Sequence, residues 1–154
     1  MVLKPELATE EFSRRFLHEA QMMAKVRHPN VAVVHDSDER EGLSYFVMDY
    51  IEGETLAQRL EAGALDAETV HALGRDLLAA LEAVHRLGIV HRDVKPANIF
   101  LTQHGALLSD FGIASSDQDE TLTGPGRRIG TPRYWAPEQN EAENVTRLAD
   151  IYSA

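Results

Sequence analysis

The sequence predicts an α+β fold, because its hydrophobic residues follow two different periods in different segments. A helical spacing recurs between residues 67 and 87, and near the start of the chain at Phe12, Phe16, Ala20 and Met23. Short β-branched or aromatic runs occur in two pairs, each joined by a polar segment that contains a glycine. These pairs predict two hairpins.

Composition indicates one soluble globular domain, with 154 residues of which 44% are hydrophobic and 26% charged. There are no cysteines, which excludes a disulfide framework and a thiolate metal site. The formal net charge of −10 argues against nucleic acid as a partner. No apolar run reaches the ~20 residues that span a bilayer, and no signal-peptide pattern is present. We therefore expect no membrane segment in this chain and a cytoplasmic location.

The first segment predicts a strand end, a turn and a helix. Residues 2–3 end the strand, and Pro5 turns the chain out of it because proline lacks a backbone donor. A helix then opens near Thr9 with acidic residues in its first turn. Glu19 lies on nearly the same face as the apolar stripe of this helix. From the residues alone it is a solvated charge at the edge of that stripe.

The two hairpins are predicted from paired apolar runs. Residues 31–34 and 43–48 form the first pair, and a polar segment with Gly42 joins them. Residues 99–102 and 106–109 form the second pair around a turn with a glycine.

Two further helices lie between the hairpins. A short helix over residues 55–61 is broken by Gly63. Asp66 caps the next helix, which covers residues 67–87 and is closed by Gly88. Its apolar positions follow the i, i+3, i+4 rule, so this helix should pack on the core.

Four polar side chains carry the predicted chemistry. Asp93, Lys95 and Asn98 occupy one short loop, and Asp110 follows in Asp110-Phe111-Gly112. The second hairpin starts at Asn98 and returns to Asp110, so it should bring the two together. Two acids and an amide suit a divalent cation, and a lysine beside them suits an anionic group. This combination favours phosphoryl transfer.

These motifs, taken in order along the chain, resemble the eukaryotic-like (Hanks-type) serine/threonine protein kinases of bacteria. The segments that carry the resemblance are Glu19, residues 49–53, 91–98, 110–112 and 136–138, and Asp150. The resemblance implies a protein-kinase-like two-lobe fold in truncated form. Residues 1–48 would be a remnant of the small lobe, residues 49–53 the hinge, and residues 54–154 an incomplete large lobe.

The resemblance also assigns roles to the loop residues. Asp93 would orient the proton of a Ser or Thr hydroxyl on a protein substrate, and Lys95 would offset charge on the transferred phosphoryl group. Asn98 and Asp110 would hold Mg²⁺. His91 and Phe111 would stack as structural residues.

For ATP, the resemblance implies further binding residues besides Lys95, Asn98 and Asp110. Met48 would be the gatekeeper beside the adenine, and the backbone of Asp49 and Ile51 would bond the adenine edge. Glu19 would ion-pair with a lysine on the preceding strand. Apart from the resemblance, a methionine such as Met48 at a strand end is most often core filler.

The resemblance also suggests regulation by phosphorylation of an activation loop, the segment that contains Thr121 and Thr123. Arg92, directly before Asp93, suggests control by phosphorylation, with Thr121 and Thr123 as candidate acceptors or as ordinary loop threonines. Thr131 fits the loop that receives the substrate hydroxyl, where a structural role is favoured.

The sequence departs from the family pattern at its start, where no glycine-rich loop is present. The essential strand lysine falls at Met1 in the favoured register, whereas a rival register places it at Lys4. We favour the first because Lys4 is followed at once by Pro5. The isolated chain should then be poorly folded and weakly active, an expectation that cooperative melting together with activity would disprove.

Two hypotheses follow for the function. One is a portion of a serine/threonine kinase, and the alternative is a pseudokinase-like binding or scaffold module. The coding sequence upstream of Met1 would discriminate them. Related bacterial kinases often carry a transmembrane helix beyond the catalytic domain, so the location of the full-length parent is left open.

Overall fold

The computed structural model describes residues 10–111, 132–140 and 145–154. It contains α-helices, β-strands and 3₁₀-helices (η), in the following order: α1 Glu10–Met23, β1 Val34–Arg40, β2 Leu43–Met48, β3 Glu54–Thr55, α2 Leu56–Glu61, α3 Ala67–His85, η2 Pro96–Asn98, β4 Ile99–Thr102, β5 Gly105–Leu108, η4 Pro132–Tyr134, α4 Pro137–Asn140 and α5 Arg147–Ser153.

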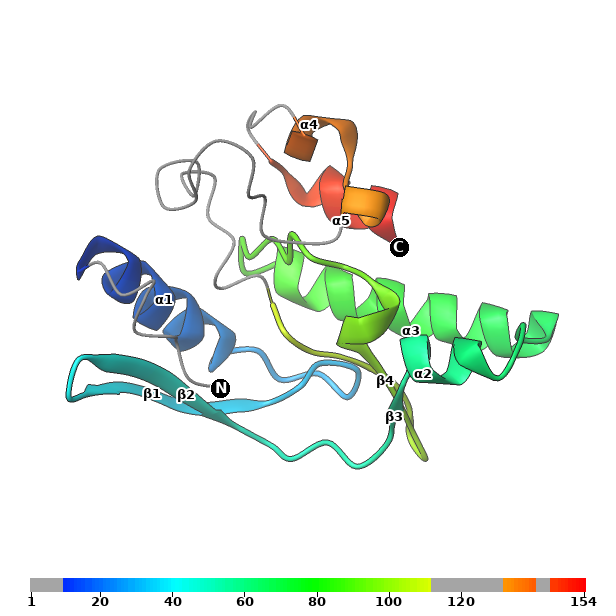
Figure 1. The fold of residues 1–154 in the computed structure, drawn as a ribbon, viewed down its shortest axis with the longest axis horizontal. Helices are drawn as coiled ribbons and strands as arrows, with labels where there is room; N and C mark the ends of the chain where they lie inside the picture. The colour runs from blue at the N-terminus through cyan, green and yellow to red at the C-terminus, as the bar shows by residue number, and fades with distance from the viewer. Residues whose placement is uncertain (1–9, 112–131, 141–144) are drawn as a thin grey trace.

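The elements form two groups that share one core (Figure 1). In the first, α1 packs beside the antiparallel β1–β2 hairpin. In the second, β3, β4 and β5 form an antiparallel sheet, and α3 packs against β5. Helices α4 and α5 lie together on one side of α3 (Figure 1). This arrangement confirms the predicted α+β class.

The predicted apolar face of α1 is buried. Phe16, Ala20 and Met23 are each at most 2% exposed, and the ring of Phe16 lies 5.7 Å from that of Phe46 on β2. The core continues through α3 and the second sheet, so α1 and the second group are tied together by apolar burial. Burial of a Phe or Met side chain contributes about 1.5–3 kcal/mol to folding. The side chain of Phe12 is outside the described residues.

The first hairpin is confirmed, but the predicted bounds of its first strand are wrong. Strand β1 begins at Val34 and runs through a polar, mostly exposed segment. Val31 instead forms a parallel bridge to Leu108 of β5, and the N–H of Leu108 donates to the carbonyl of Asn30 at 2.8 Å. The apolar residues 31–34 therefore pass through the core instead of forming the hairpin strand. A two-residue turn with φ 55° at Glu41 and 75° at Gly42 fixes the hairpin register.

The predicted cap at Asp66 is confirmed, and the structure adds a cap at Thr55. Thr55 and Gln58 form a capping box at α2, and Asp66 accepts from the N–H of Thr69 at 2.9 Å at α3. Hydrogen bonds from Thr69 to the Asp66 carboxylate lower the pKa of Asp66. Helix α3 ends two residues before the predicted Leu87. The N-terminal part of its apolar face is less buried than expected, with Val70 51% exposed.

The second hairpin is confirmed with a shift of one residue in β5. Ile99 pairs with Leu108, and the N–H of Ser109 donates to the carbonyl of Asn98 at 2.9 Å. This register places Asn98, which precedes β4, next to Ser109 and Asp110, which follow β5. Strand β3 was not predicted, because two polar residues carry no strand pattern.

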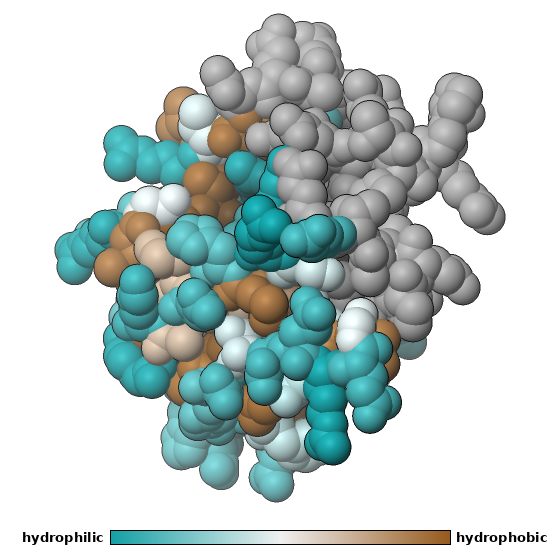
Figure 2. Space-filling view, turned by 90° about the vertical axis from the view of Figure 1, so that its left-hand side faces the viewer, coloured by the Kyte–Doolittle hydropathy of each residue, from teal (hydrophilic) through white to brown (hydrophobic). Residues whose placement is uncertain are grey.

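Several predictions lie outside the described residues. They are the strand end at residues 2–3, both positions for the strand lysine (Met1 and Lys4), Gly112, Thr121, Thr123 and Thr131. None of the described helices is long and apolar enough to cross a membrane. On the side shown in Figure 2, hydrophilic residues predominate among those that are coloured.

Candidate active site

The predicted catalytic loop, residues 91–98, gathers its polar side chains around one carboxylate. The ammonium of Lys95 lies 2.6 Å from Oδ2 of Asp93, and Nδ2 of Asn98 donates to the same oxygen at 3.0 Å. Nδ2 of Asn98 also donates to the backbone carbonyl of Asp93 at 2.8 Å. Two donors therefore fix the carboxylate, while the side chain of Asp93 stays 20% exposed.

The loop adopts this shape for local reasons. Pro96 starts the η2 turn, where its missing N–H costs nothing, and the N–H of Asn98 donates to the carbonyl of Lys95 at 2.9 Å. Val94 is buried and points into the core, so its neighbours Asp93 and Lys95 are directed to the partly exposed side.

His91 is a buried neutral ring. Its burial lowers its pKa from the ordinary value of 6.5, against the nearby charges of Asp150, Asp93 and Asp110. The backbone N–H of Asp93 donates to Nδ1, and Nε2 donates to the carbonyl of Ser109 at 3.0 Å. The ring of Phe111 lies 4.4 Å away, which confirms the predicted stacking. His91 is thus a structural residue that positions Asp93.

Arg92 has a backbone φ of 66°, a left-handed conformation that is costly for a residue with a Cβ. The carboxylate of Asp150 on α5 accepts the N–H of Arg92 at 2.7 Å and the N–H of His91 at 2.8 Å. Asp150 is 1% exposed, and Nε2 of His85 at the end of α3 lies 2.7 Å from it. The strained turn is therefore held by a buried carboxylate with three polar partners.

The structure thus adds two positioning residues to the predicted site. Asp150 contributed to the sequence motif, but its contact with the loop was not predicted. Its position in an apolar helix, directly after the buried Ala149, is the signal that could have indicated a buried role. His85 carries no such signal, since histidine is common at helix ends.

Asp110 lies beside Asn98, as the hairpin predicted. Nδ2 of Asn98 is 3.5 Å from the backbone carbonyl of Asp110, and the hydroxyl of Ser109 donates to Oδ2 of Asp110 at 3.3 Å. Asp110 also has a positive φ, of 51°. The strained backbone is held by the short connection from β5.

The donor set at this point fits Mg²⁺. Because Nδ2 of Asn98 donates to Asp93, its oxygen Oδ1 is the atom available for a cation. Asp110 adds a carboxylate. Within residues 10–111, 132–140 and 145–154 there is no group of three or more His, Asp or Glu side chains that could hold a metal by itself. Mg²⁺ takes few protein ligands and completes its shell with water and phosphate, so one amide oxygen and one carboxylate suit it.

Glu19 lies near this site but on another element. A cavity of about 220 Å³ separates α1 from residues 88–92, and Glu19, Arg92 and Phe111 are on its wall. The face of α1 that carries Glu19 is therefore directed to the catalytic loop. Its predicted lysine partner is outside the described residues.

Met48 is the last residue of β2, and Asp49 and Ile51 lie in the connection from β2 to β3. Met48 pairs with Val34 and packs against the core. The N–H of Asp49 donates to the carbonyl of Val33 at 3.1 Å, and its carboxylate lies 2.6 Å from Nε2 of His35. Asp49 can therefore offer its carbonyl, rather than its N–H, to a ligand.

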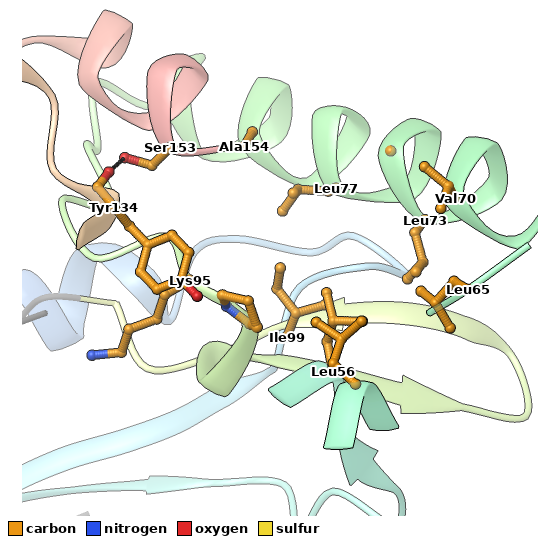
Figure 3. A pocket seen from close by; sticks show the side chains of 13 residues that line it. Leu56, Leu65, Val70, Leu73, Leu77, Lys95, Ile99, Tyr134, Ser153 and Ala154 are labelled. Carbon is orange, nitrogen blue, oxygen red and sulfur yellow. Dashed lines mark hydrogen bonds between the residues drawn. The ribbon is translucent and has the colours of Figure 1, made fainter. Parts of the chain in front are cut away.

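A larger cavity of about 270 Å³ lies between α2, α3 and α5 (Figure 3). Its wall is mainly aliphatic, and Figure 3 shows the ammonium of Lys95 turned away from these side chains. The ammonium contacts Asp93 instead. Lys95 thus lines this cavity while its ammonium belongs to the polar cluster, so the two adjoin each other.

Comparison with known proteins identifies relatives along the whole chain. Residues 2–154 match the family described as protein kinase domain. A probable serine/threonine-protein kinase of Clostridium perfringens is 39% identical, over 99% of this chain and 23% of its own length. One of Streptomyces coelicolor is 41% identical, over 98% of this chain and 24% of its own length. The chain thus spans about a quarter of the length of these relatives.

Solved structures share the fold. The crystal structure of the Mycobacterium tuberculosis PknI kinase domain matches with a TM-score of 0.80 and 35% identity, over 99% of this chain and 57% of that one. Rad53, crystallised with AMP-PNP, matches with a TM-score of 0.74 and 28% identity, over 90% of this chain and 35% of that one. These matches confirm the fold that the sequence resemblance implied.

Proposed function

The chain belongs to the protein kinase domain family, and from this premise we propose that it transfers the γ-phosphoryl group of ATP to serine and threonine hydroxyls of proteins. The proposal rests on the arrangement of four side chains: Lys95 and Asn98 hold the Asp93 carboxylate, and Asp110 lies beside Asn98. These four residues provide an acceptor for a hydroxyl proton, a cation and two oxygen ligands at one place.

In the proposed reaction, Asp93 orients the substrate hydroxyl and takes its proton. The hydroxyl oxygen forms a bond to the γ-phosphorus while the bond from that phosphorus to the bridging oxygen of ADP breaks. Lys95, 2.6 Å from Asp93, lies where it can offset the charge that develops on the transferred group. Since a carboxylate is a weak base, the gain comes mainly from orientation.

Asn98 and Asp110 would hold the metal through Oδ1 and the carboxylate, respectively. When bound, Mg²⁺ neutralises negative charge on the phosphates of ATP. The hydrogen bonds from Asn98 to Asp93 keep the amide oriented so that Oδ1 faces away from Asp93. The same side chain thereby links the metal ligand to the proton acceptor.

For the nucleotide, we assign the adenine contacts to the gatekeeper Met48, the carbonyl of Asp49 and the backbone of Ile51. Glu19 would pair with a lysine and so act on the phosphates from the other side. In this assignment residues 1–48 contribute to the small lobe, residues 49–53 form the hinge, and residues 54–154 contribute to the large lobe.

The substrate class and the regulation follow from the same loop. Asp-Val-Lys-Pro-Ala-Asn, residues 93–98, resembles serine/threonine rather than tyrosine kinases. Arg92 would sense phosphorylation at Thr121 or Thr123, two positions outside the described residues.

The test is transfer of radiolabelled γ-phosphate from Mg-ATP to matched serine, threonine and tyrosine peptides. The protein from its full reading frame and the separate 154-residue chain are compared. We expect incorporation into serine and threonine peptides, lost on chelation of Mg²⁺, and weak activity for the separate chain. Nucleotide binding without any transfer by the full protein would contradict the proposal and favour a binding or scaffold module.

A further inference from the structure

The backbone of Arg92 is held from two sides by two different elements. Its N–H is bound by Asp150 of α5, as described above. Its carbonyl accepts a hydrogen bond of 2.8 Å from Nε2 of Gln139, in the short helix α4. The residue directly before Asp93 is therefore fixed at both of its backbone polar groups, in a conformation that it would not adopt without help.

Both polar groups of the Gln139 side-chain amide form hydrogen bonds. While Nε2 donates to Arg92, Oε1 accepts the N–H of Ala136 at 3.1 Å. The two partners determine the orientation of the amide, since a carbonyl requires the NH₂ group and an N–H requires the oxygen. Ala136 itself is fully buried. The amide thus forms a bridge from residues 136–139 to the catalytic loop.

Helix α5 supports both ends of this bridge. Asp150 binds the loop, and the hydroxyl of Ser153, one turn later, donates to the carbonyl of Tyr134 at 2.6 Å. Figure 1 shows α4 and α5 close together on the same side of α3. The loop, the segment 132–140 and α5 therefore form a closed set of contacts, in which Gln139 directly links the segment to the loop.

We propose that Gln139 is a positioning residue that couples residues 132–140 to Asp93 by holding the carbonyl of Arg92. A shift of that segment would release the carbonyl, relax the strained φ of Arg92 and turn Asp93 away from Lys95 and Asn98. The catalytic consequence rests on the function proposed above, whereas the coupling itself does not.

The discriminating variant is Gln139→Glu, which keeps an oxygen for the N–H of Ala136 but replaces the donor to Arg92 with a second acceptor. Gln139→Met removes both hydrogen bonds at similar volume and without added charge. Gln103→Glu, at an exposed position in the β4–β5 turn, is the control with the same change of charge.

Hydrogen–deuterium exchange of the protein from its full reading frame gives the first readout. We expect amides in residues 91–98 to exchange about tenfold faster in both Gln139 variants, with β4, β5 and α3 unchanged. Unchanged exchange of the loop in either folded variant would overturn the coupling. So would a uniform rise across α3 and the hairpin in both variants, because Gln139 would then stabilise only the fold.

Kinetics give the second readout. We expect kcat to fall about tenfold in Gln139→Glu, with the KM for ATP unchanged and Gln103→Glu like wild type. A rise in KM at constant kcat would overturn the positioning role. If the wild-type protein transferred no phosphate, the proposed function would fail, while the exchange result would still decide the coupling.

Discussion

His91 shows how a single buried side chain makes the site sensitive to acid. The ring is fully buried, stacked on Phe111 and bonded through both nitrogens. Since burial lowers its pKa below 6.5, the folded state resists protonation while the unfolded state does not. The unfolded state therefore binds more protons below pH 6.5, and stability falls as pH decreases through that value.

We predict that His91→Phe removes this part of the acid sensitivity. The variant should be less stable than wild type at pH 7.5, because its hydrogen bonds are lost. The difference should shrink towards pH 5.5, by at most about 1.4 kcal/mol per pH unit. Urea denaturation of the protein from its full reading frame at the two pH values measures the difference, with His71→Phe, an exposed position on α3, as the reference. A constant or growing difference would disprove the neutral state of folded His91.

The connection from β2 to the second sheet depends on a close approach of two backbones. Gly53, with φ 154°, lies against the carbonyl of Leu101 on β4, and a Cβ would overlap that carbonyl. Its neighbour Glu54 pairs with Leu101. The end of the proposed hinge is thereby fixed on the sheet that leads to the catalytic loop.

We predict that Gly53→Ala lowers the free energy of unfolding by at least about 1 kcal/mol more than Gly63→Ala. Gly63 also has a positive φ, of 119°, but a Cβ added there would meet no atom within 4 Å, so it reports the backbone strain alone. Urea denaturation of both variants, made in the protein from its full reading frame, compares the two losses. Equal losses would mean that the contact with Leu101 yields without cost.

The elements differ in how far the sequence could predict them. Helices with caps and apolar stripes were predictable, because Thr55 and Asp66 act locally. The extent of β1 was not, because the burial of Val31 depends on β5, which lies far along the chain. Likewise, the cluster at Asp93 followed from loop spacing, whereas the contacts of His85 and Gln139 depend on how α3, α4 and α5 meet.

The described residues as a whole leave considerable apolar surface in water. Leu148, Ile151 and Tyr152 on α5 are 66%, 48% and 64% exposed, and Leu78 on α3 is 49% exposed. Burial of such surface contributes about 25 cal/mol per Å², and net stabilities are small. This exposure supports the expectation that the separate 154-residue chain is poorly folded.

In the proposed reaction, the loop around Asp93 performs phosphoryl transfer. The most direct measurement is the kcat of Asp93→Asn against wild type, in the protein from its full reading frame, with Mg-ATP and a serine peptide. Asparagine keeps the size of the side chain but removes the proton acceptor. We predict a fall in kcat of about 10²–10⁴-fold with the KM for ATP little changed. A variant that retained wild-type kcat would show that Asp93 does not take part in the transfer.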